Sequence, residues 1–318
     1  MGAAVEAHGI AKRYGSQIAL QDLTFSVQAG EILGVLGPNG AGKTTAIRIL
    51  TTILQPDRGT FSVAGIPSTQ PARIRARVGV LPESAGYPGR QHGEEYLRFH
   101  ARLFGHSRAG ARAVARALLE EVGLAERGRA PIATYSRGMR QRLGIARALV
   151  NDPAVVFLDE PTLGLDPAGQ HEILARVRAL AGERGAAVLL STHLLDEVEE
   201  NCSRVLILNR ARVVAEGSVL EIVRHAAAPR LARIRTTPQQ VERALAALND
   251  AAAVQQAAIA DGASGALTLA LAPAAPGSKD GSLNAVVGVL LDAGVPLLAG
   301  ELEGARLSDA FLSLTEGR

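Results

Sequence analysis

The sequence predicts an α/β domain followed by a smaller α+β domain. Residues 155–158 and 188–190 are continuous apolar runs bounded by charged or polar residues, as expected for strands buried on both faces of a sheet. Residues 168–181 between them have a helical pattern, and the order strand, helix, strand indicates parallel pairing with right-handed crossovers. After about Val223 the sequence becomes Ala-rich and punctuated by Pro, which indicates a second domain.

The rest of the first domain, residues 1–222, is predicted to hold an antiparallel sheet and an inserted helical block. Short alternating runs in residues 5–27 indicate antiparallel strands, and further strands are expected at residues 61–65 and 78–81. The inserted block covers about residues 86–151.

Two helices are expected early in this block, at residues 94–105 and 108–122. The pattern of the first helix predicts that Leu97, Phe99 and Leu103 are buried. For the second helix the predicted buried residues are Val114, Leu118 and Leu119.

The second domain, residues 223–318, is predicted to have the order β-α-β-β-α-β, a ferredoxin-like unit followed by a terminal helix. The expected strands are residues 231–234, 253–259, 267–271 and 297–302, and the expected helices are residues 238–248 and 282–291. The loop 273–281 is expected to be disordered.

Composition narrows the class of protein. The net charge of +3 is small for 318 residues and no basic tract is long, so a nucleic-acid partner is not expected. Cys202 is the sole cysteine, which excludes an internal disulfide and favours a buried thiol in a reducing cytosol. No apolar run approaches the roughly 18 residues that span a bilayer, so we expect a cytoplasmic protein that reaches a membrane only by docking.

The segment GPNGAGKTT, residues 37–45, follows the apolar run 32–36 and precedes a helical pattern. This is a phosphate-binding loop in its expected setting, so the alternative of a Gly-rich surface turn is disfavoured. Gly37, Gly40 and Gly42 let the backbone N–H groups surround phosphate. Lys43 reaches the β- and γ-phosphates and the Thr44 hydroxyl can ligate Mg²⁺. No Asn-Lys-x-Asp guanine motif occurs, so GTP is disfavoured.

Three other segments carry candidate site residues, each with a simpler alternative. Asp159 and Glu160 end the run 155–158, where Asp159 can hold a metal and Glu160 can polarise a water, or both can belong to an acidic loop. Ser136, in a segment before the expected helix 142–150, is a natural N-cap or a phosphate contact. His193 follows a strand and is either catalytic or an ordinary packed or surface residue.

In this order, these segments resemble the ATP-binding subunits of ABC transporters over about residues 5–220. The resemblance implies that residues 37–45 are the Walker A loop and residues 135–141 the signature motif. It also implies that Glu160 is the catalytic glutamate of Walker B and that His193 is the switch histidine. The expected cofactors are ATP and Mg²⁺. The nucleotide-binding residues it implies are Tyr14 (stacked on adenine), Gly37, Asn39, Gly40, Ala41, Gly42, Lys43, Thr44, Thr45, Ser136, Gly138 and Asp166.

Two motifs depart from the family pattern. Glu83 stands where the family usually has Gln, and a carboxylate there can still ligate Mg²⁺ or a water, beside Thr44 and Asp159. In the signature motif LSGGQ, Arg137 takes the third position and Met139 the fifth.

The resemblance also implies partners and a location. The signature motif of one subunit completes the Walker A site of another, so a second cassette, as a homodimer, is expected. An integral membrane permease on a separate chain is expected to hold this chain at the inner face of the cell membrane. The tail, residues 307–315, resembles that of daunorubicin-resistance exporters, which implies export of a drug, antibiotic or lipid-like compound. The simpler alternative for the tail, which is compatible with this resemblance, is an ordinary amphipathic helix with Leu307, Phe311 and Leu314 buried.

Two other functions remain open. One is an importer ATPase with a C-terminal ligand-sensing domain, since a β-α-β-β-α-β unit is a common small-ligand fold. The other is a non-transport ATPase of the same superfamily that acts on ribosomes or DNA.

Overall fold

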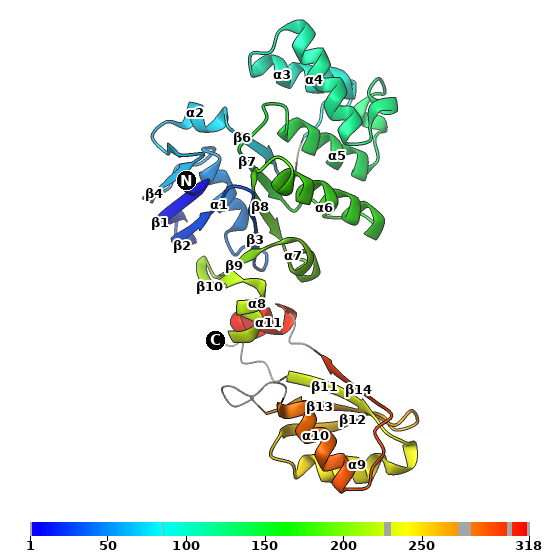
Figure 1. Cartoon of the computed structure of the whole chain (residues 1–318). Coiled ribbons are helices and arrows are strands. Elements are labelled where there is room, and N and C mark those ends of the chain that lie inside the picture. The colour runs from blue at the N-terminus through cyan, green and yellow to red at the C-terminus, as the bar shows by residue number, and fades with distance from the viewer. Residues whose placement is uncertain (1, 85, 226–229, 273–280, 304–306, 317–318) are drawn as a thin grey trace. The chain divides into compact units, whose positions relative to one another are not determined.

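The computed structural model describes residues 2–84, 86–225, 230–272, 281–303 and 307–316 (Figure 1). It divides into two compact units, Met1–Val219 and Leu220–Arg318.

An antiparallel sheet begins the first unit. Its strand order is β2-β1-β4-β5, and residues 5–27 form two antiparallel strands as predicted. The strands are β1 (Val5–Tyr14), β2 (Gln17–Val27), β4 (Arg58–Val63) and β5 (Ile66–Pro67).

A six-stranded sheet of order β10-β9-β3-β8-β7-β6 follows. All neighbours pair in parallel except β10 with β9, which confirms the predicted α/β class. Every residue of β3, β7 and β8 is buried, as the continuous apolar runs predict. The strands are β3 (Ile32–Leu36), β6 (Val78–Leu81), β7 (Val155–Asp159), β8 (Ala187–Thr192), β9 (Arg204–Asn209) and β10 (Arg212–Ser218).

Helices cover both faces of this sheet. Helix α1 (Lys43–Leu50) shares one hydrophobic core with the antiparallel sheet and with β3, β7, β8 and β9. Helices α6 (Pro167–Gly182) and α7 (Leu195–Asn201) pack against β8, and α7 also packs against β3. Gly34 permits this approach, since a Cβ there would lie 2.9 Å from Val198 of α7. The short helix α2 (Pro71–Arg75) precedes β6.

The predicted helical block lies between β6 and β7. It contains α3 (Gly93–Leu103), α4 (Arg108–Glu121), the 3-10 turns Ala125–Arg127 and Ile132–Thr134, and α5 (Arg137–Ala148). Helix α5 begins at Arg137 and not at residue 142, because the Ser136 hydroxyl caps it by accepting a hydrogen bond from Met139 N at 3.2 Å.

The predicted buried face of α3 is wrong in part. Leu97 is buried together with Tyr96 and Ala101, but Phe99 and Leu103 are 53% and 66% exposed. Two apolar stripes run along this helix, and the core of the block takes the one that contains Leu97. The other stripe faces solvent in the described structure. In α4, Leu118 and Leu119 are buried and Val114 is half-buried.

The second unit has the order β-α-β-β-α-β and a sheet of order β12-β13-β11-β14, with every neighbouring pair antiparallel. One hydrophobic core joins β11, β12 and β13 to α9 and α10. Its elements are α8 (Val219–His225), β11 (Arg230–Arg235), the 3-10 turn Pro238–Gln240, α9 (Val241–Asn249), β12 (Val254–Asp261), β13 (Ala266–Leu271), α10 (Gly281–Asp292), β14 (Ala299–Glu303) and α11 (Leu307–Glu316).

Of two predictions on the second unit, one falls outside the described residues and the other is confirmed in part. The loop 273–281 lies outside the described residues except at Gly281, where α10 begins. In α11, Leu307 is buried as predicted, whereas Phe311 and Leu314 are only half-buried.

Cys202 is buried as predicted, and burial raises the pKa of its thiol to about 12. No helix in the described ranges is both long and apolar enough to cross a membrane.

Each unit has its own hydrophobic core, so a chain that ends after Val219 is expected to fold by itself. Its thermal unfolding should be one cooperative transition, with a Tm within roughly 4 °C of the main transition of the full chain, the shift that about 1 kcal/mol produces at this size. Differential scanning calorimetry of both proteins measures this. A fragment without a cooperative transition would contradict the division.

Candidate functional site

The phosphate loop connects β3 to α1, as its sequence predicts. Lys43 is the first residue of α1, is 7% exposed, and donates a hydrogen bond from Nζ to the carbonyl of Gly37 at 2.7 Å. Gly42 has a φ of +111°, and a Cβ there would lie 2.5 Å from the carbonyl oxygen of Ala19. Only glycine lets the loop pass this close to β2.

A cavity of about 520 Å³ opens beside this loop. Ten residues of the predicted site line it, so the ends of β1, β6, β7 and β8 and the loop after β3 bring together residues from distant parts of the sequence. These residues are Tyr14, Asn39, Gly40, Gly42, Lys43, Thr44, Thr45, Glu83, Glu160 and His193.

Glu160 leaves the end of β7 in an unusual conformation. Its φ of +51° is uncommon for a residue other than glycine, and such conformations concentrate at functional sites. Its backbone N–H donates to the carbonyl of Ser191 on β8 at 2.9 Å, which holds the two strand ends together.

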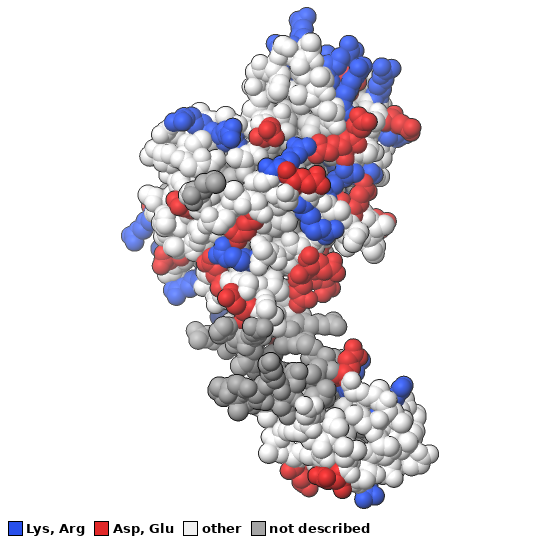
Figure 2. All heavy atoms as spheres, in the orientation of Figure 1, with Lys and Arg blue, Asp and Glu red and all other residues white. Residues whose placement is uncertain are grey.

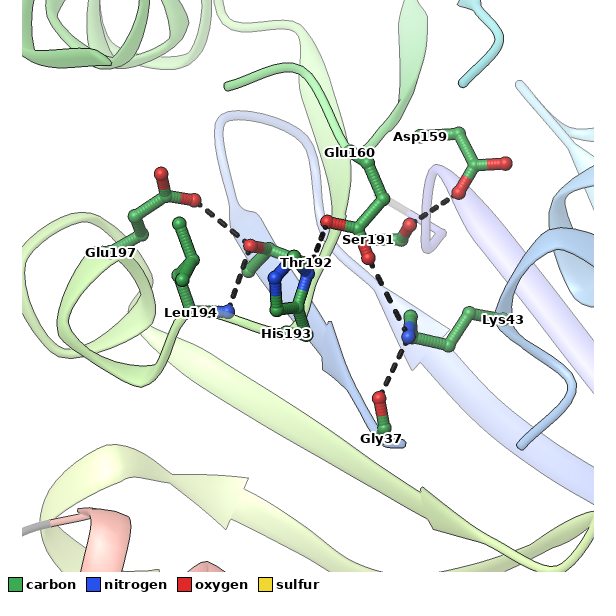
Figure 3. Close-up of polar contacts among 9 residues, drawn as sticks. All are labelled: Gly37, Lys43, Asp159, Glu160, Ser191, Thr192, His193, Leu194 and Glu197. Carbon is green, nitrogen blue, oxygen red and sulfur yellow. Dashed lines mark hydrogen bonds and ion pairs between the residues drawn. The ribbon is translucent and has the colours of Figure 1, made fainter. Parts of the chain in front are cut away.

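The Glu160 carboxylate lies between two cationic or ionisable groups (Figure 3). Its Oε1 is 3.6 Å from Lys43 Nζ, and its Oε2 is 2.8 Å from His193 Nδ1. Lys43 and Glu160 are both buried, whereas the His193 side chain is 44% exposed. A group of these three side chains can hold or move a proton and can pair with an anion that enters the cavity.

Asp159 and Glu197 lie on either side of this group. Asp159 is 2% exposed and accepts a hydrogen bond from the Ser191 hydroxyl. Glu197 of α7 is 6% exposed, and burial raises the pKa of its carboxyl group, with the Glu160 carboxylate adding to the effect. The hydroxyls of Thr162 and Thr192 lower this pKa but do not cancel the shift.

The predicted metal ligands fit a hard cation. Thr44 and Glu83 line the cavity, and Asp159 ends β7 directly before Glu160 of the lining, so a hydroxyl and two carboxylates are available. Such oxygen ligands suit Mg²⁺, which usually keeps waters and phosphate oxygens in its shell. The described residues hold no group of three or more His, Cys, Asp or Glu side chains that could bind a metal ion by themselves.

The structure does not bring Ser136, Gly138 and Asp166 to this cavity. They line a second cavity of about 440 Å³, together with Arg137 and Gly164. Asp166 caps α6 by accepting from Gly169 N at 3.2 Å. The remaining predicted residues have supporting positions: Ala41 is 3% exposed in the loop, and Gly37 binds Lys43 through its carbonyl.

Some residues of the site were missed at the sequence level. Gln17 and Ala19 line the cavity, and the hairpin signal around Gly15 could have placed Gln17 opposite Tyr14, its partner in the β1–β2 pairing. Leu163 also lines it, next to the Glu160 turn. For Glu197, the sequence shows only an acid at the start of a helix, which carries no signal of burial.

Comparison with known proteins agrees with this geometry. The profile of a family described as ABC transporter matches residues 20–163. The Nod factor export ATP-binding protein I of Burkholderia orbicola is 42% identical over 217 residues, which cover 68% of this chain and 71% of that protein. The daunorubicin resistance ATP-binding protein DrrA3 of Streptomyces coeruleorubidus is 43% identical over 220 residues, which cover 69% of each.

A solved structure described as the ATP-binding subunit of an ABC transporter superimposes with a TM-score of 0.63 at 35% identity, covering 70% of this chain and 92% of that one. The phosphate loop, the Glu160 group and these likenesses lead to one conclusion: the chain belongs to the ABC transporter family and is an ATP-binding cassette ATPase.

Proposed function

We propose that this ATPase powers export through a separate membrane permease, to which it binds at the inner face of the cell membrane. The cargo is a drug, an antibiotic or a lipid-like compound. The names of the two relatives support this direction, since one is an export protein and the other a resistance protein. The observation that carries the ATPase chemistry is the Lys43, Glu160 and His193 group at the phosphate loop.

In this proposal ATP enters the cavity with its triphosphate on the loop from Gly37 to Thr45. Tyr14, 45% exposed at the cavity, stacks on adenine. Lys43 exchanges its contact with Glu160 for the β- and γ-phosphates. Glu160 then accepts a proton from the attacking water, and His193 donates a hydrogen bond to the γ-phosphate. Mg²⁺ held by Thr44, Asp159 and Glu83 would neutralise charge on the phosphate oxygens.

The two separate cavities support a dimer. Ser136, Gly138 and Asp166 lie outside the cavity that holds Lys43, so one copy does not present both sets of residues to one nucleotide. We propose that two copies pack head to tail and that each supplies Ser136 and Gly138 to the ATP bound by the other. A symmetric arrangement of this kind makes the same contacts twice.

The Glu160→Gln variant is expected to bind ATP as the unchanged protein does and to lose turnover by roughly 10²–10⁴-fold, the usual effect of losing a general base. Phosphate release measures turnover, and fluorescence of a labelled ATP measures binding. The matched control is Glu183→Gln, which changes an exposed acid at the end of α6 and should leave turnover unchanged. Full turnover in Glu160→Gln would remove this residue from the role of base.

Complementation tests the head-to-tail dimer. Lys43→Ala and Gly138→Asp are each expected to be inactive alone. Lys43→Ala disables the phosphate loop, and Gly138→Asp places a carboxylate where the ATP bound by the other copy should have its γ-phosphate. Mixed dimers retain one intact composite site, so a mixture of the two variants should hydrolyse ATP faster than the sum of the separate proteins. A mixture that shows no gain, although exchange of subunits is verified by differently tagged chains, would contradict the arrangement.

An exposed apolar surface on the first unit supports a protein partner. Phe104 at the end of α3 and Ile53 after α1 are 43% and 68% exposed and line a groove that also includes Val80. Phe99 and Leu103 add further apolar exposure on α3. Figure 2 shows Lys and Arg side chains gathered at the end of the unit formed by α3 and α4 (Figure 1). We propose that a segment of the permease binds this groove.

Phe104→Glu is expected to abolish copurification with the permease, because a carboxylate would be buried against an apolar segment. Basal ATP turnover of the separate chain should stay within about twofold, since surface changes away from a site cost little. The control Val214→Glu alters a half-exposed valine of β10 and should copurify normally. Equal copurification of Phe104→Glu would exclude this groove.

A further inference from the structure

Glu197 is a buried carboxylate that the proposed ATPase chemistry does not use. It lies in the first turn of α7 and is 6% exposed. Its Oε2 accepts a hydrogen bond of 2.9 Å from the hydroxyl of Thr192, at the end of β8 (Figure 3). Because a buried carboxylate is costly unless it is well paired, its position next to the site requires a reason.

The Thr192 hydroxyl connects Glu197 to the loop that carries His193. This hydroxyl donates to Glu197 and accepts a hydrogen bond of 3.1 Å from Leu194 N. The Thr192 side chain, just before His193, and the Leu194 N–H, just after it, therefore meet at one hydroxyl group, which in turn donates to Glu197. The direction of the His193 ring toward Glu160 depends on this loop.

The second carboxylate oxygen of Glu197 has a matching group nearby. Glu197 Oε1 and Thr162 Oγ1 are both buried and without a hydrogen-bond partner among the described residues. The two side chains are neighbours, because the Thr162 hydroxyl lies close enough to lower the pKa of the Glu197 carboxyl group, although the pair does not have the geometry of a hydrogen bond in the structure. A hydroxyl that rotates can donate to a carboxylate oxygen, so each group can satisfy the other. Thr162 follows Glu160 by two residues and is 1% exposed.

We propose that Glu197 is a positioning residue that joins the His193 loop, through Thr192, to the Glu160 loop, through Thr162. This inference rests on the proposed roles of Glu160 and His193. In the structure the two loops also meet directly, because Glu160 and His193 hold each other at 2.8 Å. That contact must open when Glu160 turns to the attacking water and His193 to the γ-phosphate. The Glu197–Thr162 hydrogen bond then closes and keeps the two loops aligned.

Steady-state kinetics of the full chain test this role. Glu197→Ala removes both connections and is expected to lower kcat by roughly 10–100-fold, the effect of misplacing a reacting group by a fraction of an ångström to 1 Å. The KM for ATP should stay within about threefold, because the phosphate loop is untouched. Glu197→Gln can accept from Thr192 and donate to Thr162, so it should retain at least about a third of kcat.

Two further variants separate positioning from general stability. Val198→Ala changes the next residue of α7, which is fully buried, and should lower Tm without lowering kcat at a temperature where the protein is folded. Thr162→Val should lower kcat in the otherwise unchanged protein and have no further effect in Glu197→Ala, because both changes remove the same connection.

The proposal is overturned if Val198→Ala lowers kcat as much as Glu197→Ala, or if the effects of Thr162→Val and Glu197→Ala multiply. It is also overturned if Thr162→Val leaves kcat unchanged, and that measurement remains decisive where Glu197→Ala does not fold. Glu160→Gln in the same assay distinguishes a failure of the proposed ATPase chemistry from a failure of the role proposed for Glu197. Full turnover in Glu160→Gln rejects the proposed chemistry, whereas its loss together with unchanged kcat in Glu197→Ala rejects only the role of Glu197.

Discussion

Parallel pairing of β3, β7 and β8 determines where the chemistry of this chain lies. In a parallel sheet the carboxyl ends of neighbouring strands share one edge, and the residues that follow them converge there. The register places Leu36 opposite Thr192 and Asp159 opposite Ser191. The phosphate loop, the Glu160 turn and the His193 loop therefore start from adjacent points, although they are far apart in the sequence.

Opposite charges explain why Lys43 and Glu160 lie together at this edge of the sheet. Lys43 and Glu160 are both buried, and each would be costly to bury without a partner of opposite charge. Their separation of 3.6 Å is longer than that of a good charge-assisted hydrogen bond, which is typically 2.7–2.9 Å. A triphosphate bound at the loop offers Lys43 more oxygen atoms at shorter range. Nucleotide binding is thereby linked to the release of Glu160 in the proposed chemistry.

Features of the fold and the site could be predicted from the sequence where they depend on contiguous residues, and not where they depend on packing between distant elements. The phosphate loop and the buried strands could be predicted because each depends on a few contiguous residues with one physical requirement. Phe99 and Leu103 were assigned to the wrong side of α3 because two apolar stripes on one helix are equivalent until the neighbouring helices are known. Burial of Glu197 could not be predicted, since α7 packs against β8 and also against β3, which is distant in the sequence.

Gly164 makes room for Arg137, the residue that departs from the signature motif of the family. The Arg137 guanidinium lies against the backbone of Gly164, where a Cβ would be 2.5 Å from Arg137 Cζ. Gly164 also has a φ of +70°, a conformation that costs other residues free energy. The turn that leads to Asp166 thus provides both the backbone shape and the empty volume for a large side chain where the family usually has glycine. Arg137 and Gly164 line the same cavity as Ser136 and Gly138, so this pair places a cationic group beside the residues proposed to reach the nucleotide of the second copy.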